Sequence, residues 1–273
     1  LETLETALST DGNEDLLELS GVKKMELGAS AQGDGIKDFR FLSSLTQLES
    51  LTLENAYEMK SLNVLEPLGN LQELRISNGR ELRSLEPLRA LTGLRSLDIG
   101  DSTELTDLNA LSALTGLRKL RVANADWSVK GTLPDLSGLT ALEELEASEE
   151  DFAQFAPCKS IKKLTLFMNR FGDSADFTAL AGLDQLEELY LNFDKDDEKP
   201  VHIESLSALP ALRKLTVLGE DGPLPLGAFP QVTDITVIGN NIVGNLSTDA
   251  LRIDPAPDGE NTALTRLSII GFQ

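Results

Sequence analysis

A repeat of 23 residues constrains this 273-residue chain more than any other feature of its sequence. Counted from Leu94, apolar residues fall at seven fixed positions before the pattern restarts at Leu117, and these positions hold Leu94, Leu97, Ile99, Leu105, Leu108, Leu111 and Leu114. The units that begin at Leu48 and Leu71 fit this template without a gap. A period of this length predicts a solenoid, in which each unit is one small element that stacks on the next.

Each unit has two halves with different apolar spacing. The first half, L-x-x-L-x-L, ends in the alternation of a short strand. The second half has an apolar residue at every third position, which fits turns of the 3₁₀ type. Because one unit is too small to bury its own leucines, neighbouring units must stack into a continuous core. The sequence therefore predicts a parallel sheet of eleven short strands, whose units begin at Val22, Leu48, Leu71, Leu94, Leu117, Leu142, Ile161, Leu186, Leu212, Val232 and Leu264.

The segment Ser84-Leu-Glu-Pro-Leu-Arg-Ala-Leu91 and its counterpart at residues 61–68 resemble bacterial leucine-rich repeats of the internalin-like subclass. The resemblance implies an α/β fold, a right-handed horseshoe-shaped solenoid with its strands on the concave face and 3₁₀ or short helical turns and loops on the convex face. It also implies a bacterial protein that binds other proteins in secreted form or at the cell surface; a cytoplasmic location stays open.

The chain departs from this family at one place in its repeat. The family usually has Asn three residues after the last strand leucine, whereas only Asn169 and Asn240 match here; the other units hold Ala56, Gly79, Ser102, Ala125, Glu150 and Asp194. We therefore expect the turns to satisfy their backbone groups in another way.

The repeat predicts one elongated domain over residues 1–273. Residues 1–21 are either a partial repeat with a strand near Leu4 or a short capping helix, residues 22–141 are regular repeats, and residues 142–273 are irregular repeats with insertions. Insertions in repeat proteins map to loops on one face, often the binding face. Because a bare solenoid end exposes core leucines, we expect the natural protein to continue beyond one or both ends.

The composition argues against several classes of function. A formal net charge of −21 disfavours binding to nucleic acid and to an anionic membrane surface. No apolar run approaches the roughly 20 residues of a membrane span. The single cysteine, Cys158, rules out an internal disulfide framework and occupies a leucine position, so we expect it to be buried. His202 is the only histidine and is expected on the convex surface. Acid–base catalysis at neutral pH would therefore have no second histidine to work with.

Two acidic segments carry side chains that could bind a metal ion. Residues 194–198 offer carboxylates to calcium but lack the Gly and the distal Glu of an EF-hand loop. Residues 149–151 fit a solvated acidic edge better than a metal site. We therefore expect no metal, no cofactor, no enzymatic activity and a monomeric chain.

Equivalent positions of successive strands should lie side by side, about 4.8 Å apart. Two residues after the first apolar residue of each unit, the charge alternates in sign along Lys119, Glu144, Lys163, Glu188, Lys214, Asp234 and Arg266. This row is either a ladder of cross-strand charge pairs that fixes the register or a surface for a partner of mixed charge.

The residue six positions after the first apolar residue of each unit is small or polar in the first half of the chain and largely apolar in the second. Apolar surface patches and aromatic side chains mark interaction sites. The predicted binding residues are Phe167, Tyr190, Leu218, Ile238 and Ile270, with Trp127 and Phe193 as candidate loop anchors. The alternative is that the long insertion after the tenth strand folds over this face and covers these residues.

The sequence thus predicts a non-catalytic protein-interaction module that binds through its concave face and flanking loops. The partner is unidentified, and a basic partner would suit the acidic chain. The alternative is a structural spacer within a larger, cell-surface protein.

Overall fold

The computed structural model describes residues 3–7, 21–28, 38–123, 132–148, 152–168, 175–193, 201–218, 230–239 and 263–271. The chain divides into two compact units, Leu1–Leu142 (unit 1) and Glu143–Gln273 (unit 2), and each is described by itself. The prediction of one domain over residues 1–273 stays a prediction.

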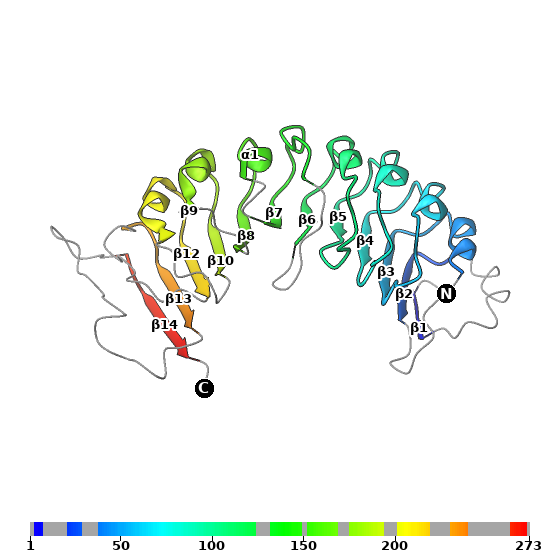
Figure 1. Cartoon of the computed structure of the whole chain (residues 1–273), viewed down its shortest axis with the longest axis horizontal. Helices are drawn as coiled ribbons and strands as arrows, with labels where there is room; N and C mark the ends of the chain where they lie inside the picture. Colours follow the sequence, from blue (N-terminus) through cyan, green and yellow to red (C-terminus); the bar gives the residue numbers. More distant parts are fainter. Residues whose placement is uncertain are drawn as a thin grey trace. The chain divides into compact units, whose positions relative to one another are not determined.

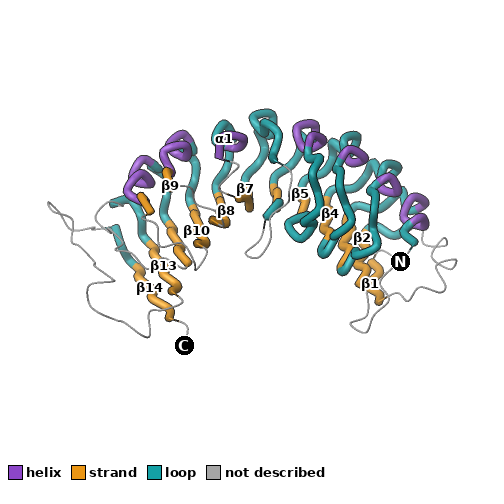
Figure 2. Tube along the Cα trace, in the orientation of Figure 1, coloured by secondary structure: helices purple, strands orange, loops and turns teal. Residues whose placement is uncertain are grey.

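Unit 1 contains a parallel sheet whose strands pair in chain order. Its strands are β1 (Thr3–Ala7), β2 (Lys24–Gly28), β3 (Ser50–Glu54), β4 (Glu73–Ile76), β5 (Ser96–Asp98) and β6 (Lys119–Arg121). Its 3₁₀ turns lie on the side opposite the strands (Figures 1 and 2) and are η2 (Arg40–Ser44), η3 (Asn63–Leu65), η4 (Glu86–Leu88) and η5 (Asn109–Ala113). Because β1 pairs with β2, the first repeat begins with a strand, and the alternative of a capping helix there is wrong.

Unit 2 repeats this arrangement with more variable connections. Its parallel strands are β7 (Glu144–Ser148), β8 (Lys163–Met168), β10 (Glu188–Phe193), β12 (Lys214–Leu218), β13 (Asp234–Gly239) and β14 (Arg266–Gly271). The turns are α1 (Phe152–Phe155), η7 (Phe177–Gly182) and η8 (Ile203–Ala208). Two short strands, β9 (Ala175–Asp176) and β11 (Val201–His202), pair with each other outside the main sheet, so His202 lies in β11.

All eleven predicted strands are present, and each begins two residues after the first apolar position of its unit. In the units that start at Leu48, Leu71 and Leu94, every one of the seven template positions is no more than 2% exposed. The 3₁₀ spacing is also confirmed, because the backbone N–H of Leu65 donates to Leu62 O (2.8 Å) and that of Leu68 to Leu65 O (2.9 Å). Cys158 is buried in its leucine position, as expected.

The turns after β3 and β4 replace the missing asparagines with asparagines one residue earlier. Asn55 and Asn78 have φ of 57° and 55°, a left-handed conformation that Asn tolerates better than most residues. Asn78 Nδ2 donates to Asn55 Oδ1 (3.0 Å), which links the two repeats. The following position then holds small side chains, and a Cβ atom at Gly79 would lie 2.7 Å from Ser102 Oγ.

Ser102, which follows β5, allows a test of how this region contributes to stability. Its side chain is fully buried, and Oγ has no hydrogen-bond partner among the described residues. A buried, unsatisfied hydroxyl costs about 1–3 kcal/mol, so Ser102→Ala should raise the free energy of unfolding by about 1 kcal/mol, measured by urea unfolding followed by circular dichroism. The matched control is Ser112→Ala at an exposed site, which should stay within about 0.5 kcal/mol of the native chain. A loss of stability in Ser102→Ala would contradict the prediction.

Candidate functional site

The outward side chains of unit 2 form straight rows because its strands pair in register. The first row is the alternating charge ladder, confirmed by the pairing Glu144–Lys163–Glu188–Lys214–Asp234–Arg266. Within it, Glu188 is shared by two lysines: Lys163 Nζ lies 3.5 Å from Oε1 and Lys214 Nζ lies 3.4 Å from Oε2. From Lys163 to Lys214 the ladder therefore satisfies its charges internally, which supports the interpretation that it fixes the register. Each exposed pair contributes little stability.

Two further rows run beside the charge ladder and carry no charge from β8 to β14. One row is Thr165, Tyr190, Thr216, Thr236 and Ser268; the other is Phe167, Asn192, Leu218, Ile238 and Ile270. We call these ten residues the uncharged band. The predicted place of Tyr190 between Thr165 and Thr216 is confirmed by the register.

The band is accessible over β10 to β14, whereas on β8 Thr165 is half-buried and Phe167 is buried. Ile270 is exposed, whereas Tyr190, Leu218 and Ile238 are half-buried. Burial raises the pKa of the Tyr190 hydroxyl above its ordinary value of 10, so this group stays neutral and able to donate a hydrogen bond at physiological pH.

Two of the predicted binding residues, Phe167 and Phe193, are buried. Phe167 is only 7% exposed, and its row neighbour Ser148 is 8% exposed, so both side chains at this end of the row are buried. Phe193 is 6% exposed because β10 continues its alternation by one residue and turns Phe193 inward beside the buried Met168. Trp127 and residues 240–262 of the insertion after β13 lie outside the described residues.

The corresponding face of unit 1 is different, because one of its rows is charged. The row equivalent to Thr165–Ser268 holds Glu26, Thr52, Arg75, Asp98 and Arg121. Asp98 lies between two arginines: Arg75 Nε is 3.5 Å from its Oδ2 and Arg121 Nη1 is 3.1 Å from its Oδ1. This face is therefore polar and internally paired, and offers little apolar contact.

The structure also shows a surface pair that the sequence interpretation missed. Tyr57 is exposed after β3, and the Arg80 guanidinium lies 5.2 Å from the centre of its ring. The Tyr57 hydroxyl donates to Asn55 Oδ1 (3.1 Å). The only signal in the sequence was the 23-residue separation of Tyr57 and Arg80, which places them at equivalent positions of adjacent repeats.

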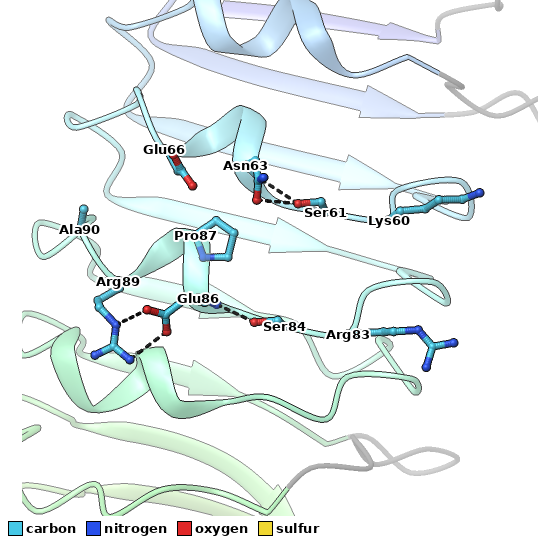
Figure 3. A pocket seen from close by; sticks show the side chains of 10 residues that line it. All are labelled: Lys60, Ser61, Asn63, Glu66, Arg83, Ser84, Glu86, Pro87, Arg89 and Ala90. Carbon is cyan, nitrogen blue, oxygen red and sulfur yellow. Dashed lines mark hydrogen bonds and ion pairs between the residues drawn. The ribbon is translucent and has the colours of Figure 1, made fainter.

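A groove of about 720 Å³ lies on the turn side of unit 1, between the segments around η3 and η4 (Figure 3). Eight of its ten lining residues are polar or charged, and several of these side chains bond one another. Arg89 forms a two-pronged ion pair with Glu86 (2.6 and 2.8 Å), and Ser61 Oγ donates to Asn63 Oδ1 (2.6 Å). Ser84 Oγ accepts from the Glu86 backbone N–H (3.0 Å) and donates to Asp107 Oδ2 (2.7 Å). The Ser84–Asp107 bond connects successive repeats and the others fix the turns within a repeat, so we assign the groove a structural role.

Within the described ranges there is no group of three or more His, Cys, Asp or Glu side chains placed to hold a metal ion. Residues 194–198, considered above for calcium, and residues 149–151 fall outside those ranges. Among the helices that the structure describes, none is long and apolar enough to span a bilayer.

Comparison with solved structures gives the fold of the chain. An internalin (inlF) of Listeria monocytogenes str. 4b F2365 is similar over 100% of this chain and 82% of its own, with a TM-score of 0.64 and 20% sequence identity. TLR13, solved in complex with ssRNA13, is similar over 99% of this chain and 44% of its own, with a TM-score of 0.59 and 20% identity. The plant peptide hormone receptor RGFR1, solved in complex with RGF2, is similar over 88% of this chain and 43% of its own, with a TM-score of 0.53 and 14% identity.

These likenesses confirm the leucine-rich-repeat solenoid, and the predicted resemblance to internalins holds at the level of the fold. In sequence, no protein-family model and no curated protein matches the chain.

Asp107 gives a pH test of the bonds that connect the repeats. The Ser84 hydroxyl and then the Asn109 backbone N–H hold the pKa of the Asp107 carboxyl below its ordinary value of 3.8. A lowered folded-state pKa stabilises the fold above pH 3.8, and this contribution is lost as the pH falls through the folded-state value. Asp107→Asn should therefore cost about 1–2 kcal/mol at pH 7, and the difference from the native chain should shrink in urea titrations below pH 3.8.

The control for Asp107→Asn is Glu58→Gln, which removes an exposed carboxylate of the same unit and should change stability by less than about 0.5 kcal/mol. A difference between Asp107→Asn and the native chain that is the same at pH 7 and pH 2.5 would contradict the assignment.

Proposed function

We propose that this chain is a non-catalytic protein-binding module and that a protein partner docks on the uncharged band of unit 2. One observation carries the proposal: four adjacent strands, β10 to β14 in the main sheet, present two accessible rows without charge in a chain of net charge −21. The cores of protein interfaces are likewise depleted of charged residues, with a polar rim around them.

The side chains of the band supply both attraction and orientation. Leu218, Ile238 and Ile270 would lose their remaining exposed surface on binding, which is worth about 1–2 kcal/mol for each well-covered side chain. The hydroxyls of Tyr190, Thr216 and Thr236 can hydrogen-bond to the polar groups of a partner. The charge ladder at the side of the band would then form the polar rim, where charges set the orientation and the association rate more than the affinity.

The net charge helps to choose the class of partner. Among solenoids of this fold, TLR13 is solved in complex with ssRNA13 and the plant peptide hormone receptor RGFR1 in complex with RGF2. A net charge of −21 repels a nucleic acid, whose binding needs a basic footprint. It also accelerates encounter with a basic protein. We therefore propose a partner that is basic overall and has an apolar docking segment, and, from the resemblance to internalins, a secreted or cell-surface location.

The test uses a double variant, Leu218→Asp with Ile238→Asp, which places two charges in the band. The native chain would be used to capture partners from the growth medium and extracts of the source organism and of cells it contacts. Any partner that is identified would then be titrated by calorimetry. The double variant should bind at least about 30-fold more weakly, which corresponds to about 2 kcal/mol.

The control is Thr52→Asp, which adds a charge on the outward face of unit 1, in the row equivalent to Thr165–Ser268. It should bind like the native chain, and circular dichroism should show that all variants are folded. Equal binding by the double variant would place the site outside the band. No saturable partner for the native chain would argue against a binding module and in favour of a structural spacer.

A further inference from the structure

One of the two rows of the uncharged band consists of hydroxyl side chains alone. It runs across adjacent strands of unit 2 as Thr165, Tyr190, Thr216, Thr236 and Ser268. Because these strands pair in register (Figure 1), successive members of the row are about 4.8 Å apart. All five side chains are half-buried, so part of each stays open to solvent.

The fold does not use these hydroxyls. Among the residues that the structure describes, none of the five side chains in the row has a hydrogen-bond partner. Two threonines outside the row behave differently: Thr233 Oγ1 donates to Arg213 O (3.2 Å), and Thr265 Oγ1 donates to Thr233 O (3.1 Å). The row therefore offers a line of hydrogen-bond donors to a molecule bound on the band.

The need for acceptors limits which partner segments can use the row. The backbone carbonyls of an α-helix already accept hydrogen bonds within the helix. A polyproline II helix has no internal hydrogen bonds, so its carbonyls are free to accept. A single extended strand also has unpaired carbonyls. The hydroxyls thus favour a segment in one of these two open conformations.

The strand spacing decides between the two conformations. A polyproline II helix repeats every three residues, or about 9.3 Å, and two strand spacings measure about 9.6 Å. An extended strand repeats every two residues, or about 6.8 Å, which falls between one and two strand spacings. Tyr190 in β10 and Thr236 in β13 are two spacings apart, with Thr216 in β12 between them. Both can therefore meet the same face of a polyproline II helix that runs across the strands.

We propose that the uncharged band binds a proline-rich segment of the partner protein in the polyproline II conformation, lying across β10 to β13. Its carbonyls accept hydrogen bonds from Tyr190, Thr216 and Thr236, and an apolar side chain at every third position contacts Leu218 and Ile238. Proline-rich segments dock against aromatic side chains, and Tyr190 supplies one. The inference rests on the proposed function in taking a protein as the partner, and it names the chemistry of the segment that is bound.

A synthetic peptide tests the proposal without an identified partner. The probe is fluorescein-labelled Pro-Pro-Leu-Pro-Pro-Leu-Pro-Pro-Leu-Pro-Pro between Gly-Ser flanks, titrated with the full chain and followed by fluorescence anisotropy. The control peptide, Pro-Leu-Pro-Pro-Pro-Leu-Pro-Pro-Pro-Leu-Pro, has the same composition and length. It should bind at least about 5-fold more weakly, because a spacing of four residues points its leucines to different sides of a helix with three residues per turn.

Two valine substitutions separate this mode of binding from apolar contact alone. Thr216→Val with Thr236→Val keeps the β-branched shape of both side chains and removes two hydroxyls, so the probe should bind about 10-fold more weakly. A segment held by apolar contact alone would bind this more apolar variant as tightly or more tightly. The control is Thr52→Val, at a half-buried outward position of β3, which should leave the affinity unchanged. Circular dichroism would verify that both variants are folded.

Equal binding of the two peptides would overturn the inference, as would binding that the two valines do not weaken, or no binding of the probe at millimolar concentration. Binding that appears only after residues 242–260 are replaced by a Gly-Ser linker would also overturn it, because the chain's own insertion would then occupy the band.

A protein partner distinguishes this failure from failure of the proposed function. A partner that is lost by the Leu218→Asp, Ile238→Asp variant and kept by the double valine variant would leave the band as the binding site and remove the polyproline II segment. A partner that binds both double variants as it binds the native chain would remove the band itself.

Discussion

Burial of the repeat leucines against the neighbouring repeat is the interaction on which the rest of the structure depends. No single unit encloses its own apolar side chains, so each leucine is removed from water by contact with the next unit. The 3₁₀ turns make this possible, because a hydrogen bond between leucines three residues apart points every third side chain inward. The outward rows are a consequence of the same stacking, since strands that share a core at a fixed period also share a register.

The fold could be predicted from the sequence because the residues that form the core recur at fixed positions of the repeat. Leu94 to Leu114 and its two preceding units gave the strands, the 3₁₀ spacing and the buried set, and the row order on the outward face followed from counting alone. Residues 1–21 could not be settled in this way, because Leu1, Leu4 and Leu8 fit one helix face and Leu4 with Thr6 fits a strand; the pairing of β1 with β2 decides for the strand.

The candidate site was predicted less completely, because accessibility depends on what packs above a position and not on its place in the repeat. Phe167 has the row position of Leu218, yet it is buried beside Ser148. Phe193 was assigned to a loop, whereas β10 extends far enough to turn it inward. The asparagines at Asn55 and Asn78 were visible in the sequence at the repeat spacing, but their function depends on a left-handed backbone that no residue count reveals.

The alternating charge ladder of unit 2 has a consequence for how such a solenoid changes its length. Duplication of one repeat would place two like charges on adjacent strands, about 4.8 Å apart, whereas duplication of two consecutive repeats would preserve the alternation. Growth or loss of repeats in this unit is therefore favoured in pairs. In unit 1, Ser50 and Ser96 separate the charges of the corresponding row, and the same constraint applies to the neighbouring row, where Asp98 lies between Arg75 and Arg121.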